Sequence, residues 1–124
     1  MSHVVMIQTQ VRDPIAIDLS CRRLQLKPPV YGPAKLFRET KTGWAVELPG
    51  WLYPVVCNTA SGQVEFDNFE GRWGKQEELN RFLQGYAVEK AKLEARKAGH
   101  SVAESLLEDG SVRVTVSVCG GSHS

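Results

Sequence analysis

Residues 76–118 decide the fold, and they read QEELNRFLQGYAVEKAKLEARKAGHSVAESLLEDGSVRVTVSV. The first half of this stretch is dominated by good helix formers. Apolar side chains recur in it at a spacing of about 3.6 residues, which places them on one helical face. They are Leu79, Phe82, Leu83, Tyr86 and Leu93. The pattern predicts a helix over 76–98, with Gly99 as its stop.

The second half of the stretch predicts a β-hairpin. From Val112 onward, valines alternate with polar residues, so one side of a strand over 112–118 is apolar. Asp109-Gly110 is a favoured hairpin turn, and residues 102–107 supply the incoming strand. We expect the row of valines and the apolar stripe of the long helix to be buried together against one sheet.

The N-terminal part predicts a strand followed by a shorter helix. Residues 3–11 are rich in β-branched and apolar side chains, which favours a strand. Asp13 is a good N-cap, and Pro14 fits the first helical position because its missing N–H would be unpaired there. Pro28-Pro29 prevents the helix from continuing. The expected apolar stripe of this helix is Ile15, Leu19 and Leu24.

The middle of the chain predicts four short strands, over 35–39, 43–48, 53–58 and 63–66. Turn-forming residues at 40–43, 49–50 and 61–62 separate them, and residues 25–34 resemble an extended connector. The element order is then β-α-β-β-β-β-α-β-β. We expect an α+β fold in which two helices pack on one face of a mainly antiparallel sheet.

Composition favours one ordinary globular domain. The chain has 124 residues, of which 42% are hydrophobic and 23% charged, so it is unlike a disordered segment. We expect a single domain over 1–119 and a flexible tail over 120–124. The net charge of +1 creates no overall attraction to nucleic acid or membrane. Without a signal peptide or an apolar run of about 20 residues, we expect a cytoplasmic protein with no membrane contact.

No catalytic, metal or cofactor site is expected. The three cysteines are far apart and form no CxxC pair, which favours reduced, buried thiols. They are Cys21, Cys57 and Cys119. No two of His3, His100 and His123 have the spacing of a local metal pair, although His3 and Cys119 would meet if the terminal strands were neighbours. No nucleophile elbow or phosphate-binding loop is present, so we expect a protein that is not an enzyme.

One candidate interface is the aromatic segment Trp51, Leu52 and Tyr53, which lies in Pro-Gly-Trp-Leu-Tyr-Pro. This segment resembles a hairpin tip, and exposed aromatic side chains of this kind anchor protein interfaces. The alternative is that the tip folds back onto the sheet. An unpaired sheet edge offers a second route, by which the chain would self-associate into a homo-oligomer.

A second candidate site is a set of basic residues on the long helix, which would contact an anion or nucleic acid. They are Arg81, Lys90, Lys92 and Arg96. Lys90 lies toward the apolar face, either as a lysine whose stem covers the core or as one poised to bind an anion or a partner carboxylate. Glu94 can pair with Lys90 and with Lys97, so the whole set can equally be a solvated face.

Both ends of the chain resemble one known family. The matching stretches are 1–13, MSHVVMIQTQVRD, and 72–118. The shared motifs are Ser2-His3, Thr9-Gln10, Asp13, Trp73-Gly74, Asn80, Gln84, Tyr86-Ala87 and Glu108-Asp109-Gly110. In these motifs the chain resembles the hypothetical chloroplast reading frame 35 family, known as domain of unknown function 1257. Gly85 and Val88 depart from the family pattern, which has arginine and an aromatic residue there.

The resemblance implies a function in protein assembly. The family has no established catalytic activity, and its members look similar to proteins that are encoded near AAA+ ATPases. It therefore implies a non-catalytic accessory or adaptor protein that acts through protein–protein contacts, with an AAA+ ATPase as the candidate partner. The alternative function is a small RNA- or DNA-binding module that uses the basic residues of the long helix.

Overall fold

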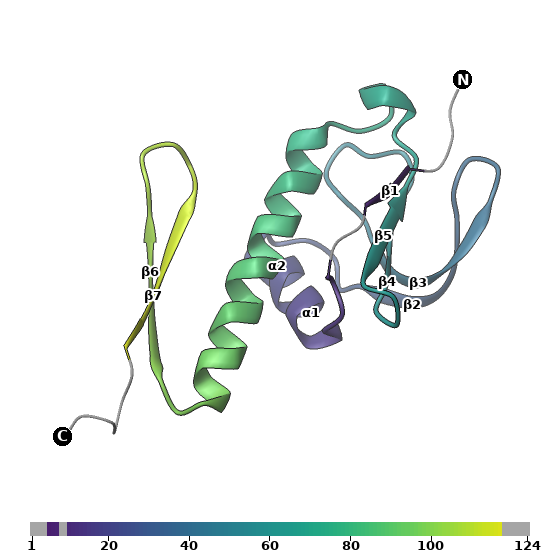
Figure 1. Ribbon diagram of the computed structural model, residues 1–124. Coiled ribbons are helices and arrows are strands. Elements are labelled where there is room, and N and C mark those ends of the chain that lie inside the picture. The colour runs from purple at the N-terminus through teal and green to yellow at the C-terminus, as the bar shows by residue number, and fades with distance from the viewer. Residues whose placement is uncertain (1–4, 8–9, 118–124) are drawn as a thin grey trace.

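The computed structural model describes residues 5–7 and 10–117 (Figure 1). Its elements are β1 (Val5–Ile7), α1 (Pro14–Arg23), β2 (Val30–Lys35), β3 (Thr40–Val46), β4 (Val55–Asn58), β5 (Gln63–Phe66), the 3-10 turn η1 (Phe69–Gly71), α2 (Gln76–Lys97), β6 (Ser101–Leu106) and β7 (Val112–Ser117). The predicted α+β class and element order are confirmed. The predicted tail over 120–124 lies outside the described residues, as do His3, His123 and Cys119.

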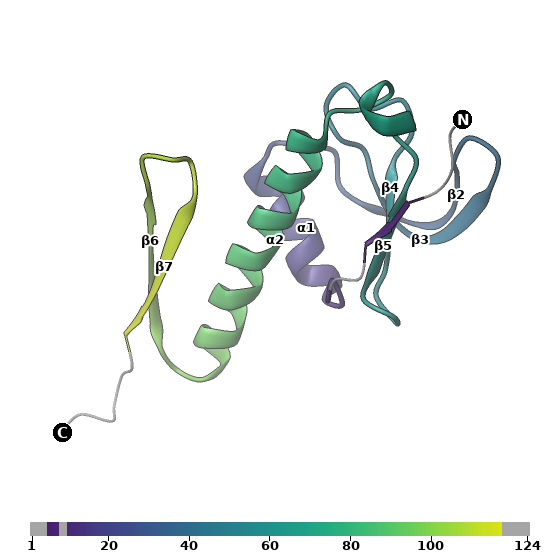
Figure 2. The same ribbon diagram turned by 45° about the horizontal axis from the view of Figure 1, so that its top comes forward.

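Five strands form one antiparallel sheet in the order β1-β5-β4-β3-β2. Both helices lie on the same side of it, as Figure 2 shows. The core between them joins side chains of both helices to one face of β3, β4 and β5. Its buried members include Ile17, Cys21, Val46, Val55, Cys57, Val64, Leu79, Phe82 and Tyr86. The apolar stripe predicted for the long helix is confirmed.

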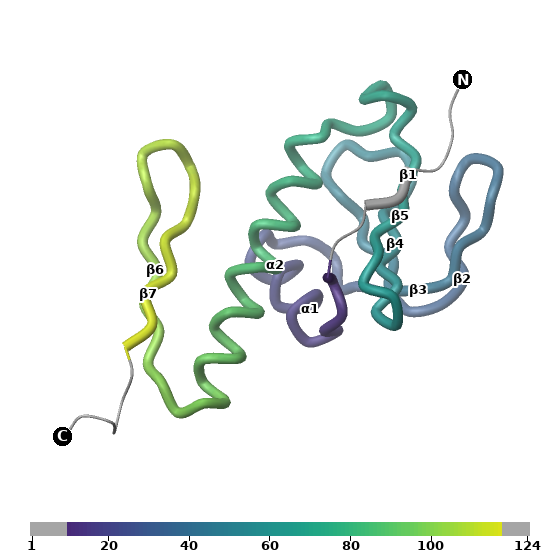
Figure 3. The backbone as a smooth tube through the Cα atoms, viewed as in Figure 1, coloured from purple at the N-terminus to yellow at the C-terminus, as the bar shows by residue number. Residues whose placement is uncertain are grey.

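The β6–β7 hairpin differs from the prediction because it forms a separate two-stranded sheet. The face of α2 that carries Tyr86 already packs on the five-stranded sheet. Gly99, with φ of 81°, ends α2, and the chain then returns along the opposite side of the helix (Figure 3). The valine row therefore faces α2 from outside, and Val116 remains 43% exposed.

The β2–β3 hairpin is displaced from its predicted position. Residues 30–34, predicted as a connector, belong to β2, and residues 36–39 form the turn, closed by a 2.7 Å hydrogen bond from the Leu36 amide to the Glu39 carbonyl. Pro33 is tolerated because β2 is an edge strand. Gly43 acts inside β3, because a Cβ there would lie 2.6 Å from the Cys57 carbonyl oxygen. The strand predicted to begin at Gly43 is confirmed, and residues 40–42, predicted as a turn, extend it as the start of β3.

Helix α1 begins where the sequence predicts, but it buries a different face. The Asp13 carboxylate accepts hydrogen bonds from the amides of Ile15 and Ala16, at 2.9 and 3.4 Å. Ile15, expected in the core, is 62% exposed, and the small residues Ala16 and Ser20 are buried instead. Small side chains allow α1 to approach α2 closely, and the Ser20 hydroxyl donates to the Phe82 carbonyl at 2.9 Å.

Neither α1 nor α2, the two α-helices of the described ranges, is long and apolar enough to cross a bilayer.

Candidate protein-interaction site

The segment Trp51, Leu52 and Tyr53 lies in the loop between β3 and β4, and its expected exposure is confirmed only at Leu52, which is 61% exposed. Trp51 is half-buried: its indole N–H donates to the Lys75 carbonyl at 3.0 Å, and its ring packs edge-on against Phe66. Of the two alternatives for this segment, folding back onto the chain holds for Trp51 and Tyr53, which are half-buried, and exposure holds for Leu52.

Tyr53 belongs to an aromatic cluster, which we define as Phe37, Tyr53, Phe69 and Trp73. The Trp73 ring is its centre, with centroids 5.0 Å from Phe37, 5.7 Å from Tyr53 and 4.8 Å from Phe69. The members come from the β2–β3 turn, the loop before β4, η1 and the loop before α2. The Leu52 amide donates to the Trp73 carbonyl at 2.8 Å, which places the exposed leucine beside the cluster.

An arginine lies over two of the three rings that surround Trp73. The guanidinium carbon of Arg38 is 5.5 Å from the Phe37 ring centroid, and that of Arg72 is 5.1 Å from the Phe69 ring centroid. Phe37 is 38% exposed. Aromatic side chains, phenylalanine included, and arginine are enriched in the buried centre of protein interfaces, and tryptophan, tyrosine and arginine contribute most of the binding energy there. Phe37 stands next to Arg38 in the sequence, and Phe69 stands three residues before Arg72. Both aromatic–arginine pairs are visible in the sequence, but neither was predicted as part of a site.

The turn that presents Phe69 is strained. Phe69 and Glu70 have φ of 48° and 54°, in the left-handed region that non-glycine residues rarely adopt. Hydrogen bonds hold it in place: the Phe69 amide donates to Asp67, and the buried Asn68 amide group donates to the Gly74 carbonyl. Strained backbone of this kind costs about 1–3 kcal/mol per residue and concentrates at functional sites.

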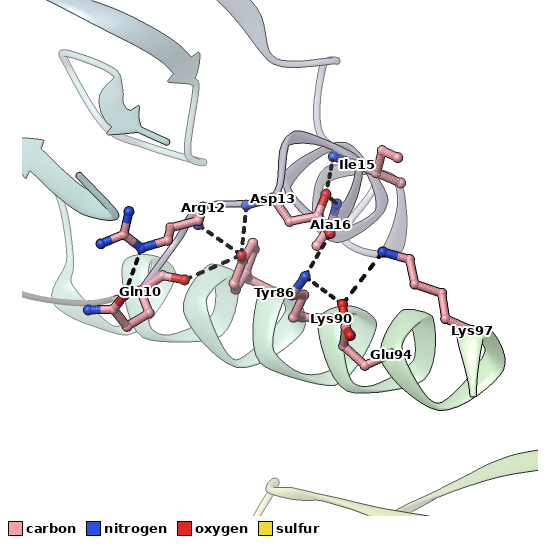
Figure 4. A network of polar contacts seen from close by, with 9 residues as sticks. All are labelled: Gln10, Arg12, Asp13, Ile15, Ala16, Tyr86, Lys90, Glu94 and Lys97. Carbon is pink, nitrogen blue, oxygen red and sulfur yellow. Dashed lines mark hydrogen bonds and ion pairs between the residues drawn. The ribbon is translucent and has the colours of Figure 1, made fainter. Parts of the chain in front are cut away.

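The basic residues of α2 are placed differently, because most of them are already paired. Lys90 lies 3.0 Å from an Asp13 oxygen and 2.8 Å from a Glu94 oxygen, and Lys97 lies 3.6 Å from Glu94 (Figure 4). Glu94 and then Asp13 raise the pKa of Lys90, so its amine stays charged. Lys90 is thus paired with two carboxylates of its own chain, whereas one of the sequence-based alternatives was an anion or the carboxylate of a partner.

Lys92 belongs to an ion-pair network that sequence reasoning missed, which we define as Arg23, Glu89, Lys92 and Glu104. Arg23 lies 2.9 Å from Glu89 and 2.5 Å from Glu104, and Lys92 lies 2.6 Å from Glu104 and 3.5 Å from Glu89. The network joins α1, α2 and β6, with two cations and two carboxylates. Arg23 and then Lys92 lower the pKa of Glu104 from 4.5 to about 2.

The remaining two basic candidates do not complete a positive stripe. Arg81 lies 3.5 Å from Glu78 in the preceding turn, while Arg96 is exposed near the end of the helix. Three of the four candidates therefore have a carboxylate partner within the chain. A nucleic-acid surface needs an excess of positive charge. Because carboxylates of the same chain neutralise three of these four residues, little excess positive charge remains on α2.

An open groove of about 400 Å³ lies along α2, and Lys90 and Glu94 are among its lining residues. Its other lining residues are Gln10, Val11, Leu83, Tyr86, Ala87 and Ala91. The lysine there is already compensated by two carboxylates, so the groove mainly offers apolar surface.

The buried thiols are unsuited to nucleophilic chemistry. Cys21 and Cys57 are free and fully buried, as predicted. Burial raises the pKa of Cys21 to about 11 and that of Cys57 to about 12, so both remain protonated at neutral pH. A protonated thiol is a poor nucleophile and a poor metal ligand.

No family model matches the chain, and neither does any curated protein or solved structure. The resemblance to the chloroplast reading frame family thus remains a prediction.

Proposed function

We propose that this protein is a non-catalytic adaptor that binds a protein partner through the aromatic cluster and the adjacent Leu52. The observation that carries the proposal is that three aromatic side chains from separate segments converge around Trp73, and an arginine lies over two of them, Phe37 and Phe69. Leu52 and Phe37 give this surface an exposed apolar part. Partly exposed aromatic and apolar side chains surrounded by arginines suit a partner that covers them and excludes water.

The alternative, an RNA- or DNA-binding module based on α2, has less support. Lys90 and Lys92 each contact two carboxylates, and Arg81 contacts one. A phosphate would have to compete with those carboxylates for each cation. The rings of the aromatic cluster also pack tilted or edge-on against one another, which uses up faces that nucleobases would need for stacking.

The family resemblance supplies a candidate for the partner, an AAA+ ATPase. This part of the proposal rests on the motifs at the two ends of the chain, and the aromatic cluster itself requires only a protein surface with a complementary apolar pocket. Trp73 belongs both to those motifs and to the centre of the cluster.

The test compares Leu52→Asp with Ile15→Asp in affinity capture from the native cell, followed by mass measurement of the intact complex. Leu52 and Ile15 are equally exposed, at 61% and 62%, so both variants should fold. Leu52→Asp places an unpaired carboxylate in an apolar contact, and because burying such a charge costs more than about 2 kcal/mol, we expect the variant to weaken capture more than tenfold. Ile15→Asp, on α1, should retain the partner.

The proposal fails if Leu52→Asp retains the same partner as the unaltered chain. It also fails if the two variants lose the partner equally, because the loss would then not be specific to the aromatic cluster. Binding of the unaltered chain to RNA or DNA at low salt, abolished when Arg81 and Arg96 are neutralised, would instead favour the nucleic-acid alternative.

A further inference from the structure

Within residues 5–7 and 10–117, the β6–β7 hairpin has an edge with no strand beside it. Among the described strands, β7 pairs with β6 alone, in a register that runs from Leu106 opposite Val112 to Ser101 opposite Ser117. Two-stranded ribbons are only marginally stable in water. This hairpin is held to the rest of the molecule through Glu104 and a partly covered apolar face.

The hydrogen bond at the start of β7 shows which backbone groups face that edge. The Leu107 amide donates to the Ser111 carbonyl at 2.8 Å, so this pair is hydrogen-bonded across the hairpin. Hydrogen-bonded and non-hydrogen-bonded pairs alternate along an antiparallel ladder. The backbone N–H and C=O groups of Val112, Val114 and Val116 therefore point away from β6, toward the open edge.

We propose that β7 pairs through this edge with β7 of a second copy, giving a four-stranded antiparallel sheet across a twofold axis. The sequence of β7 allows two favourable registers for pairing with β7 of a second copy. An axis at Val114 places Val112 opposite Val116 and Arg113 opposite Thr115, and an axis at Thr115 places Val114 opposite Val116 and Arg113 opposite Ser117. In both registers valine faces valine, and Arg113, the only charge of β7, never faces itself.

The opposite edge of the hairpin is less suited to this pairing. The outward groups of β6 include those of Glu104, whose carboxylate is already bonded to Arg23 and Lys92. An axis at that residue would set two such carboxylates against each other, which is unfavourable. In β7 every outward residue is a valine, so its edge offers backbone hydrogen bonds with no charge to displace.

A β7–β7 pair also covers apolar surface that the single chain leaves open. Directly opposed residues of an antiparallel pair lie on the same side of the sheet, so the valine rows of the two copies form one face. Both α2 helices then lie on that face. Val116, 43% exposed in the single chain, becomes part of a central strand.

The test measures mass by sedimentation equilibrium for the unaltered chain and three variants. Val114→Pro removes one outward N–H and leaves the β6–β7 hydrogen bonds in place, whereas Val114→Ala keeps that N–H. Leu106→Pro makes the same kind of deletion on the β6 edge. We expect the unaltered chain, Val114→Ala and Leu106→Pro to be dimeric, and Val114→Pro to be monomeric.

A second measurement, on the unaltered chain, does not depend on how the proline variant folds. Hydrogen exchange of the amides of Val112, Val114 and Val116 should slow as protein concentration rises, while that of Val102 and Leu106 should not change. A monomeric unaltered chain, a dimeric Val114→Pro, or exchange that is independent of concentration would overturn the proposal. The β7 edge is separate from the aromatic cluster, so monomeric Val114→Pro should still capture the partner of the adaptor. Failure of the dimer proposal can therefore be told apart from failure of the proposed partner binding.

Discussion

At the scale of single residues, Tyr86 ties the long helix to the segment that precedes α1. Its hydroxyl oxygen accepts hydrogen bonds from the amides of Arg12 and Asp13, each at 3.0 Å (Figure 4). Tyr86→Phe leaves both amides without that acceptor, and we expect it to lower the free energy of unfolding by about 1–3 kcal/mol. Urea denaturation measures this.

The matched control for that prediction is Tyr31→Phe, which removes a hydroxyl from a tyrosine that is 61% exposed. It should change stability by less than about 0.5 kcal/mol. If the two variants changed the free energy of unfolding equally, the hydrogen bonds of the Tyr86 hydroxyl would contribute nothing to stability.

Gly85 shows why the crossing of the two helices needs a residue without a side chain. A Cβ at this position would lie 2.6 Å from the Ser20 hydroxyl oxygen. Gly85→Ala should destabilise the fold by about 1–3 kcal/mol through overpacking, which outweighs the gain of about 1 kcal/mol in helix propensity. The double variant with Ser20→Ala should lose less than the sum of the two single losses. Strict additivity, measured by urea denaturation, would contradict the close approach.

Single residues were predictable from sequence where the cause is local. The cap at Asp13 and the start at Pro14 follow from backbone chemistry within one turn, and both are confirmed. The burial of Ser20 in place of Ile15 was not predictable, because it depends on Gly85, which is distant in the sequence. A glycine inside a helix was the available signal for a close crossing.

At the scale of elements, the hairpin is fastened to the helices by the network around Glu104. Because the pKa of Glu104 in the folded chain is about 2, below its ordinary value of 4.5, its ion pairs stabilise the hairpin above pH 4.5. They are lost as the pH falls from about 4.5 through about 2. We expect NMR shifts of β6 and β7 to change over this range, before those of the five-stranded sheet.

Glu104→Gln is the control for the acid prediction. It removes the titrating group, so the hairpin should be looser at neutral pH and should no longer respond selectively between pH 4.5 and 2. Hairpin shifts with the same pH dependence in both proteins would contradict the role given to the network.

Element boundaries were predictable where periodicity was strong and unpredictable where it was not. Helix α2 and strands β5 and β7 fall within a residue of their predicted limits. Strand β2 was missed because Pro33 and Gly32 are signals of a connector, and only its place at the sheet edge makes them acceptable. That place is set by pairing with β3, which no local pattern reveals.

At the scale of the whole molecule, α2 separates two sheets, with the five-stranded sheet on one side and the hairpin on the other (Figure 1). The α+β class was predictable from local periodicity. The division into two sheets was not, since the alternating valines specify an apolar face without specifying what covers it. The aromatic cluster escaped prediction for the same reason, because its members are spread over 37–73.

Hydrogen exchange of the chain, free and in its purified complex, tests most directly whether the aromatic cluster binds the partner. The account predicts slower exchange on binding at the backbone amides of Phe37, Leu52, Tyr53 and residues 69–73. Unchanged exchange at those amides, with protection confined to residues 81–96 of α2, would contradict it.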